Sequence, residues 1–474
     1  MASCLGLAAL AALLRLPFLG SVGPDEGGYA YVAAQWARGQ ALYRSAWVDR
    51  PQGLMLAYRL LDSIAQTAWA IRLGAVAAAT CITLLLVAIG RLADSRSSGL
   101  VAGALYAAVG IGPNIEGFTF NGELAAAVPA TAAVAAALVA YRSESRRWLV
   151  LAALLGGAAI LMKQSGFDGL AVVFCVSVLG RRGRRARLGA LALALGAAAL
   201  PLALSALAGW LTGWRFYWSA LVSYHLSGSS SLPLGTRLSH LLGTLPAAGR
   251  DLLPLALLAL FGCWRLRRSP VVSRLALVWL AAALAGVNLG GLYWPHYYVQ
   301  LLPPLALLGA LGLAQLPDRR LVWAATALVA VPALSFVTNV VRAPDSRSDR
   351  LVAYAAGYEN DQRLAGYVRR HSSPRDSVYA LESRADFYFL ADRAAASPYL
   401  WAHPLNEIPG ALASLERRLA MRTRPRFVVL FQQPPRHGEG AGLGPILRRY
   451  YVTVWRAPQT RTAVLADVRV LHRR

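Results

Sequence analysis

The stretch Gly-Pro-Asp-Glu-Gly-Gly-Tyr, residues 23–29, stands between a short apolar run at 3–20 and a long one at 71–90. It places two adjacent carboxylates, Asp25 and Glu26, at the mouth of the first run. Charged groups at a membrane surface are costly to desolvate and commonly mark a functional site. The apolar runs decide the fold, and the acidic pair between them is the first candidate site.

The 474-residue chain is 57% hydrophobic, whereas soluble domains are roughly 45–50% apolar. Several runs reach the roughly 17–25 residues that cross a bilayer, so a mainly α, polytopic membrane protein is predicted. About eleven spans are expected, and two of them are short for a full crossing. Their approximate positions are 3–20, 71–90, 99–112, 123–141, 148–163, 166–180, 188–210, 240–263, 275–292, 298–316 and 321–340.

The net charge of +25 does not point to nucleic acid, because its distribution follows the membrane. Arginines gather in every second loop, as the positive-inside rule describes for cytoplasmic loops. This pattern predicts a cytoplasmic N-terminus and an outward-facing loop 21–70 in the cytoplasmic membrane. The arginine-bearing loops lie at 91–96, 142–147, 181–187, 265–274 and 319–320.

Residues 342–474 differ in composition from the preceding part, since they are charged and contain no span. We therefore expect a transmembrane domain over 1–341 and a small extracytoplasmic α/β domain over 342–474. Apolar spacing predicts helices at 364–371 and 410–420. Short β-rich runs bounded by turn residues predict strands at 377–381, 387–390, 427–431, 451–455 and 462–466.

The first candidate residues each allow a structural alternative. Two adjacent carboxylates repel, so Asp25 or Glu26 is suited to act as a base; alternatively, Asp25 caps a helix. Arg50, in the stretch Val-Asp-Arg-Pro-Gln-Gly at 48–53, could hold a phosphate with two hydrogen bonds. Alternatively it pairs with Asp49 at the surface, which contributes little.

Further candidates lie at the outward ends of apolar runs. Glu123 begins a predicted span, where an acid also favours the helix dipole, and Glu116 in the same loop is expected to be solvated. Lys163, the sole lysine, is either a cation for a lipid phosphate or a snorkelling side chain. The aromatics around His296 fit an interfacial belt, which explains His296 and Gln300 less well.

Missing motifs narrow the chemistry. There is no Asp-X-Asp and no phosphate-binding loop. The four cysteines lie in or beside apolar runs and imply no disulfide framework. Because nucleotides are scarce on the outer side, a donor carried on a membrane lipid fits a site there.

Taken in order, these motifs resemble a known family, the GT-C glycosyltransferases of the protein O-mannosyltransferase and aminoarabinose transferase type (glycosyltransferase family 39). The resemblance covers roughly residues 10–340 and is greatest to the bacterial branch with an appended C-terminal exterior domain. It is carried by Asp25-Glu26, Tyr29, Gly39, Tyr43, Asp49-Arg50-Pro51, Asn121-Gly-Glu123, Lys163-Gln164-Ser165 and the stretch from His296 to Pro304. Where the family often has Lys-Pro-Pro, this chain has Arg50-Pro51-Gln52; the charge is kept, but the two cations are not equivalent.

The resemblance implies an inverting transfer of a sugar from a polyprenyl-phosphate donor to a glycan, lipid or protein hydroxyl. Asp25 would be the base and Glu26 would orient it or the acceptor. The departing phosphate would be neutralised by Arg50, Lys163 and His296. Substrate contacts would come from Tyr29, Asp49, Asn121, Glu123, Gln164, Tyr297 and Gln300. No cofactor is implied except a possible divalent metal ion.

Two other readings stay open. Membrane charges and aromatic gates would also serve a transporter or flippase of lipid-linked or polar substrates, although those proteins concentrate charge along broken helices at mid-membrane. The other alternative is a structural or assembly subunit. The sequence does not specify the sugar or the acceptor.

Overall fold

The computed structural model describes residues 2–227, 232–265, 270–343, 357–381, 384–435, 440–456 and 462–471. These residues form two compact units. The first contains 2–20, 50–57 and the described chain from 64 to 343; the second contains 21–49, 58–63 and the described residues from 357 onward. The loop carrying Asp25 thus groups with the C-terminal segment, whereas its place in the sequence suggests the transmembrane part.

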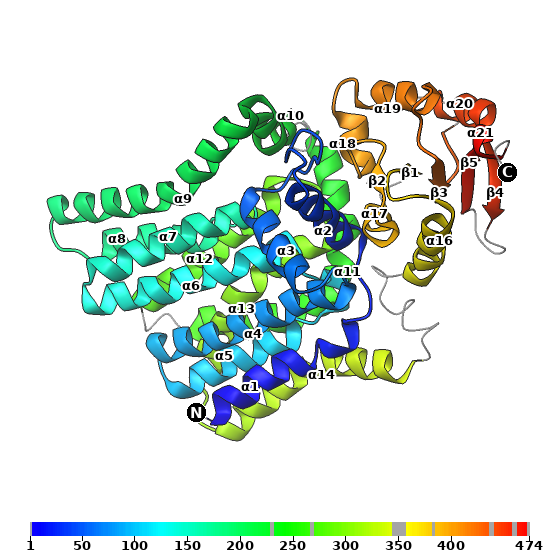
Figure 1. Cartoon of the computed structure of the whole chain (residues 1–474). Coiled ribbons are helices and arrows are strands. Elements are labelled where there is room, and N and C mark those ends of the chain that lie inside the picture. The colour runs from blue at the N-terminus through cyan, green and yellow to red at the C-terminus, as the bar shows by residue number, and fades with distance from the viewer. Residues whose placement is uncertain are drawn as a thin grey trace. The chain divides into compact units, whose positions relative to one another are not determined.

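The first unit is helical, and each expected span falls on a helix (Figure 1). Its main helices are α1 (Ala2–Leu13), α4 (Ala68–Ala93), α5 (Arg96–Val109), α6 (Gly122–Ser143), α7 (Arg146–Met162), α8 (Asp168–Leu179), α9 (Arg184–Trp218), α11 (Leu234–Arg265), α12 (Pro270–Leu289), α13 (Leu302–Leu313) and α14 (Arg319–Arg342). Short elements join them, including α10 (Tyr224–Ser227) and the 3₁₀ turns η2 (Pro113–Ile115) and η6 (Pro295–Leu301).

Five helical stretches in the described residues are long and apolar enough to cross a membrane. They are Ala68–Ala93, Gly122–Ser143, Arg184–Ser227, Leu234–Trp264 and Arg319–Arg342. Three shorter apolar helices accompany them, at Ala2–Phe18, Asp168–Leu179 and Arg274–Leu289. The chain is therefore a mainly helical, multi-pass membrane protein.

Close contact between α4 and α5 depends on a glycine. A Cβ placed on Gly99 would lie 2.3 Å from the carbonyl oxygen of Val87. No larger residue fits there without separating the helices. Small residues serve this purpose in membranes, where packing rather than water exclusion joins helices.

The second unit contains a five-stranded sheet of order β2-β1-β3-β5-β4. Strand β1 pairs in parallel with β2 and β3, and β5 pairs antiparallel with β3 and β4. The strands are β1 (Ser377–Leu381), β2 (Ala394–Ala395), β3 (Phe427–Leu430), β4 (Tyr451–Arg456) and β5 (Ala463–Asp467). The helices are α2 (Pro24–Ala37), α16 (Tyr358–His371), α17 (Asp386–Ala391), α18 (Ala402–Glu407), α19 (Ala411–Ala420), α20 (Leu443–Tyr450) and α21 (Val468–Leu471), while α3 (Gln52–Ile64) contributes residues to both units.

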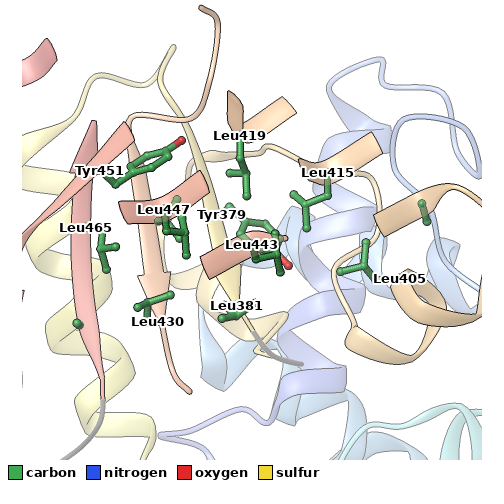
Figure 2. Packing of buried hydrophobic residues seen from close by; sticks show 13 residues of the cluster. Tyr379, Leu381, Leu405, Leu415, Leu419, Leu430, Leu443, Leu447, Tyr451 and Leu465 are labelled. Carbon is green, nitrogen blue, oxygen red and sulfur yellow. The ribbon is translucent and has the colours of Figure 1, made fainter. Parts of the chain in front are cut away.

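One hydrophobic cluster joins the sheet to α19 and α20 (Figure 2). Leu415 and Leu419 on α19, and Leu443 and Leu447 on α20, are spaced four residues apart and so share one helix face. The apolar faces of the two helices pack against sheet residues including Tyr379, Val428 and Leu465. The period of the apolar residues is what made the α19 prediction correct.

One element of the predicted sheet is wrong. Residues 387–390, expected as a strand, form helix α17, and β2 was missed. Phe387 and Tyr388 are adjacent and both fully buried, and the backbone N–H of Ala380 on β1 donates to the Tyr388 hydroxyl at 2.9 Å. A short apolar run does not distinguish a buried helix from a strand, since its pattern lacks a period.

A buried charge cluster fastens α16 to α17. Arg384 forms ion pairs with Asp361 on α16 and with Asp386 on α17, the latter at 3.0 Å. Both carboxylates are almost fully buried. Burial raises the pKa of Asp386, and the Arg384 guanidinium only partly offsets that effect.

Arg384→Met is expected to destabilise the second unit by about 3–5 kcal/mol at neutral pH, because it leaves two buried carboxylates without their cation. A raised folded-state pKa means that the folded chain keeps its proton longer as pH rises. The stability that Asp386 contributes is therefore fully present below its unfolded-state pKa. It is lost as the pH rises through its folded-state pKa. The defect should shrink in acid, as measured by thermal unfolding at several pH values.

The matched control is Arg363→Met, which removes an exposed pair with Glu359 on α16. Its expected cost is about 0–1 kcal/mol. Equal losses for the two variants would contradict a structural role for the buried cluster.

Candidate active site

Helix α2 begins with the acidic pair. Gly23 is its N-cap, and the Gly23 N–H donates to Glu26 Oε2 at 3.1 Å. Glu26 is fully buried. The capping position considered for Asp25 is therefore held by Gly23, and Glu26 supplies the capping side chain.

Asp25 lies in the first turn and is partly buried. Its Oδ1 accepts a hydrogen bond from Trp401 Nε1 at 2.9 Å. The ring of Tyr29, one turn later, lies 5.6 Å from that of Trp401 and 5.7 Å from that of Tyr58. Asp25 and Tyr29 therefore stand on one aromatic-lined face of α2 within the second unit.

The second charged pair lies at the point where the chain passes between the units. Asp49 is half-buried and belongs to the second unit, while Arg50 is buried and belongs to the first. Just after them, Gln52 Oε1 accepts a hydrogen bond from Ser205 of α9 at 2.6 Å.

The first unit gathers a second group of charged side chains. Lys163, directly after α7, forms an ion pair with Glu123 in the first turn of α6. The Lys163 ammonium also lies 3.7 Å from the ring centroid of Tyr297. The Lys163 and Glu123 side chains are only 9% and 1% exposed, so this lysine is directed into the protein rather than toward solvent.

His296 extends this group. Its Nδ1 lies 2.9 Å from Glu116 Oε2, and its Nε2 lies 3.9 Å from Glu123 Oε1. Glu116 is 14% exposed, so the expectation that it is solvated was wrong. The sequence does not reveal this contact, because it forms only when the η6 turn packs His296 against Glu116.

Two of the predicted amide side chains make hydrogen bonds, one within its own loop and one to a residue distant in the sequence. Asn121 caps α6, accepting from the Leu124 N–H and donating to Thr119, each at 2.8 Å. Gln164 Nε2 lies 3.1 Å from His225 Nε2.

Gln300 belongs to a buried cluster that includes an acid not predicted as a site residue. Gln300 donates to the Ser165 carbonyl at 2.8 Å and to Asp168 Oδ1 at 3.0 Å. Trp279 Nε1 donates to the other oxygen of Asp168 at 2.7 Å. The signal in the sequence was an acid inside an expected span, at 166–180.

Two arginines within apolar segments were also missed, and they brace the loop that carries Glu116. Arg15 donates to the carbonyls of Gly110 at 2.6 Å and Gly117 at 3.3 Å. Arg72 donates to the Phe118 carbonyl at 2.8 Å. Both arginines are 1% exposed, so they act as rigid supports rather than surface charges.

Within the described parts of the chain, no group of three or more His, Cys, Asp or Glu side chains is arranged to hold a metal ion. In the Lys163 group, the lysine is paired with Glu123, and His296 lies against Glu116. Any anion entering it would meet a lysine and a histidine already oriented by carboxylates.

Known structures share this architecture over nearly the whole chain. No protein-family model matches the sequence, and no curated protein matches it. ArnT from Cupriavidus metallidurans bound to undecaprenyl phosphate superposes with a TM-score of 0.67 at 15% identity, covering 98% of this chain and 97% of that one. The chain has the fold of GT-C glycosyltransferases.

A more distant GT-C protein is also similar. The oligosaccharyltransferase AglB from Archaeoglobus fulgidus, in complex with an inhibitory peptide and a dolichol-phosphate, gives a TM-score of 0.53 at 13% identity. The match covers 98% of this chain and 74% of that one.

The apo form of the Cupriavidus ArnT gives a TM-score of 0.64 at 15% identity, over 98% and 97% of the two chains. The fold predicted from the ordered motifs is thereby confirmed.

Lys163→Met is expected to destabilise the first unit by about 3–5 kcal/mol, because it strands the buried Glu123 carboxylate. Adding Glu123→Gln should recover much of that loss, since the neutral amide needs no counter-ion. Thermal unfolding in detergent micelles measures both effects. The control is Arg181→Met, which removes a pair with the exposed Glu144 and should cost about 0–1 kcal/mol.

If the double variant is as unstable as the sum of the two single variants, the ion pair is not the interaction that matters. The coupling between the two positions is therefore the decisive quantity.

Proposed function

We propose that this protein transfers a sugar from a polyprenyl-phosphate donor to an acceptor hydroxyl at the outer face of the cytoplasmic membrane. Support comes from the fold, because the structures that share it were determined with undecaprenyl phosphate and with a dolichol-phosphate. The single observation that carries the proposal is the Lys163 group, a buried cation and histidine held by carboxylates in the GT-C fold. Such a group is suited to a phosphate that gains charge as it leaves.

The reaction is a displacement at the anomeric carbon. Asp25 takes the proton of the acceptor hydroxyl, and the hydroxyl oxygen forms a bond to the anomeric carbon as the bond to the phosphate oxygen breaks. The product sugar has the inverted configuration, and polyprenyl phosphate leaves with the electron pair. Phosphate is a good leaving group, so no strong general acid is needed.

The cations stabilise the departing phosphate. Arg50, Lys163 and His296 are assigned this role, which is strongest in a buried site because the local dielectric is low. Since Lys163 rests on Glu123 and Tyr297, it is already oriented before donor arrives. Glu123 also remains the candidate contact to acceptor sugar or to a divalent ion.

The remaining residues are assigned to orientation and binding. Glu26 orients Asp25 indirectly, through its hydrogen bond to the Gly23 N–H at the start of α2. Substrate contacts are assigned to Tyr29, Asp49, Asn121, Gln164, Tyr297 and Gln300. The hydrogen bonds of Asn121 and Gln300 leave both side chains strongly oriented.

The membrane arrangement is part of the proposal. About eleven spans, with the N-terminus in the cytoplasm, place both α2 and the C-terminal domain outside. Support comes from the arginines that cluster in alternate loops, although positions 266–269 of one such loop lie outside the described residues.

Asp25→Asn should lower sugar transfer by roughly 10²- to 10⁴-fold, because the amide cannot accept the acceptor proton. The assay incubates purified protein in liposomes with radiolabelled polyprenyl-phosphate sugars and candidate acceptors. Asp392→Asn is the control, since Asp392 is an exposed acid of the same unit paired with Arg38. Normal turnover by Asp25→Asn in a folded protein would remove Asp25 from the mechanism, and lipid movement without glycosylated product would favour a flippase.

Cysteine labelling tests the orientation. In a variant with the four native cysteines replaced, Glu407→Cys should react with a membrane-impermeant maleimide on intact cells. Arg185→Cys, in the first turn of α9 within the arginine-rich stretch 181–187, should react only after permeabilisation. The reverse pattern would contradict an outward-facing C-terminal domain.

A further inference from the structure

The C-terminal segment 385–401 contacts α2 along its length. A Cβ on Gly27 would lie 2.5 Å from the Cα of Asp386, and a Cβ on Gly28 would lie 2.5 Å from the Trp401 ring. The two glycines therefore allow α17 and Trp401 to approach the backbone of α2. A side chain at Gly27 would displace Asp386 on α17, and one at Gly28 would displace the Trp401 ring.

A second contact fixes the rotation of α2. The Ala395 N–H on β2 donates to the Tyr31 hydroxyl at 2.7 Å. Burial raises the pKa of Tyr31 to about 12, so the hydroxyl stays neutral. Together with the glycine contacts, this hydrogen bond leaves Asp25 on the side of α2 that faces Trp401.

We propose that Trp401 is a positioning residue for Asp25, so that the C-terminal segment 385–401 contributes a residue to the active site. This inference rests on the proposed role of Asp25 as base. The indole ring carries one N–H donor and no acceptor. That N–H donates to Oδ1 of Asp25 at 2.9 Å.

The contact has one consequence for a base. It restricts the carboxylate to one rotamer, which preorganises the site. Removing the N–H should therefore lower turnover.

The test is Trp401→Phe in the full-length protein, which keeps an aromatic ring and removes the N–H. We expect kcat to fall roughly 10- to 100-fold, the loss typical of a hydrogen bond to a charged group. KM for the lipid donor should stay within about twofold, because the bond acts on the base and not on donor binding. Trp455→Phe on β4, the same change elsewhere in the unit, should leave kcat unchanged.

The outcomes separate this inference from the proposed function. An inactive Asp25→Asn with a Trp401→Phe variant of normal kcat would overturn the positioning role alone. An active Asp25→Asn would overturn the proposed function. A fall in kcat for Trp401→Phe that Trp455→Phe reproduces would mean that the loss comes from packing and not from the bond to the carboxylate. Far-UV circular dichroism and thermal unfolding establish that each variant is folded.

Discussion

Buried charge must be compensated, and that constraint organises both units of this protein. Lys163 lies on Glu123, His296 on Glu116, and Arg384 on two aspartates, all with little exposure to solvent. The desolvation cost of each ion is several kcal/mol, so each position is tolerated only with its partner in place. The side chains are consequently held in single arrangements before any substrate arrives.

Compensation of this kind is useful for catalysis. A cation that is already desolvated and oriented stabilises developing charge without reorganising at the moment of reaction. Arg15 and Arg72 support this arrangement indirectly. They donate hydrogen bonds to backbone carbonyls of the loop that carries Glu116. The rigidity of the Lys163 group thus derives from interactions made well away from it.

The second unit depends on a different device, the close approach of two segments that are distant in the sequence. Residues 23–37 and 385–401 are separated by most of the chain, yet Gly27 and Gly28 let them touch. The candidate base is therefore framed by side chains from the C-terminal segment.

Much of this protein was determined by local sequence. Apolar runs long enough to span a bilayer become helices wherever they occur, because unpaired backbone groups are too costly in lipid, and this is why every expected span falls on a helix. The period of Leu415 and Leu419 likewise predicted α19, and the alternative of a helix cap at Asp25 placed a helix start close to where α2 begins. The short run at 387–390 has no period, so its helical state followed only from packing.

Tertiary structure alone decided which side chains meet. The pairing of His296 with Glu116, of Gln300 with Asp168 and of Trp401 with Asp25 joins positions 180, 132 and 376 residues apart. No local preference encodes such contacts, because they arise when whole helices and strands pack. The sequence therefore supplied candidate site residues, while the fold decided their partners, since a partner is chosen by proximity in space.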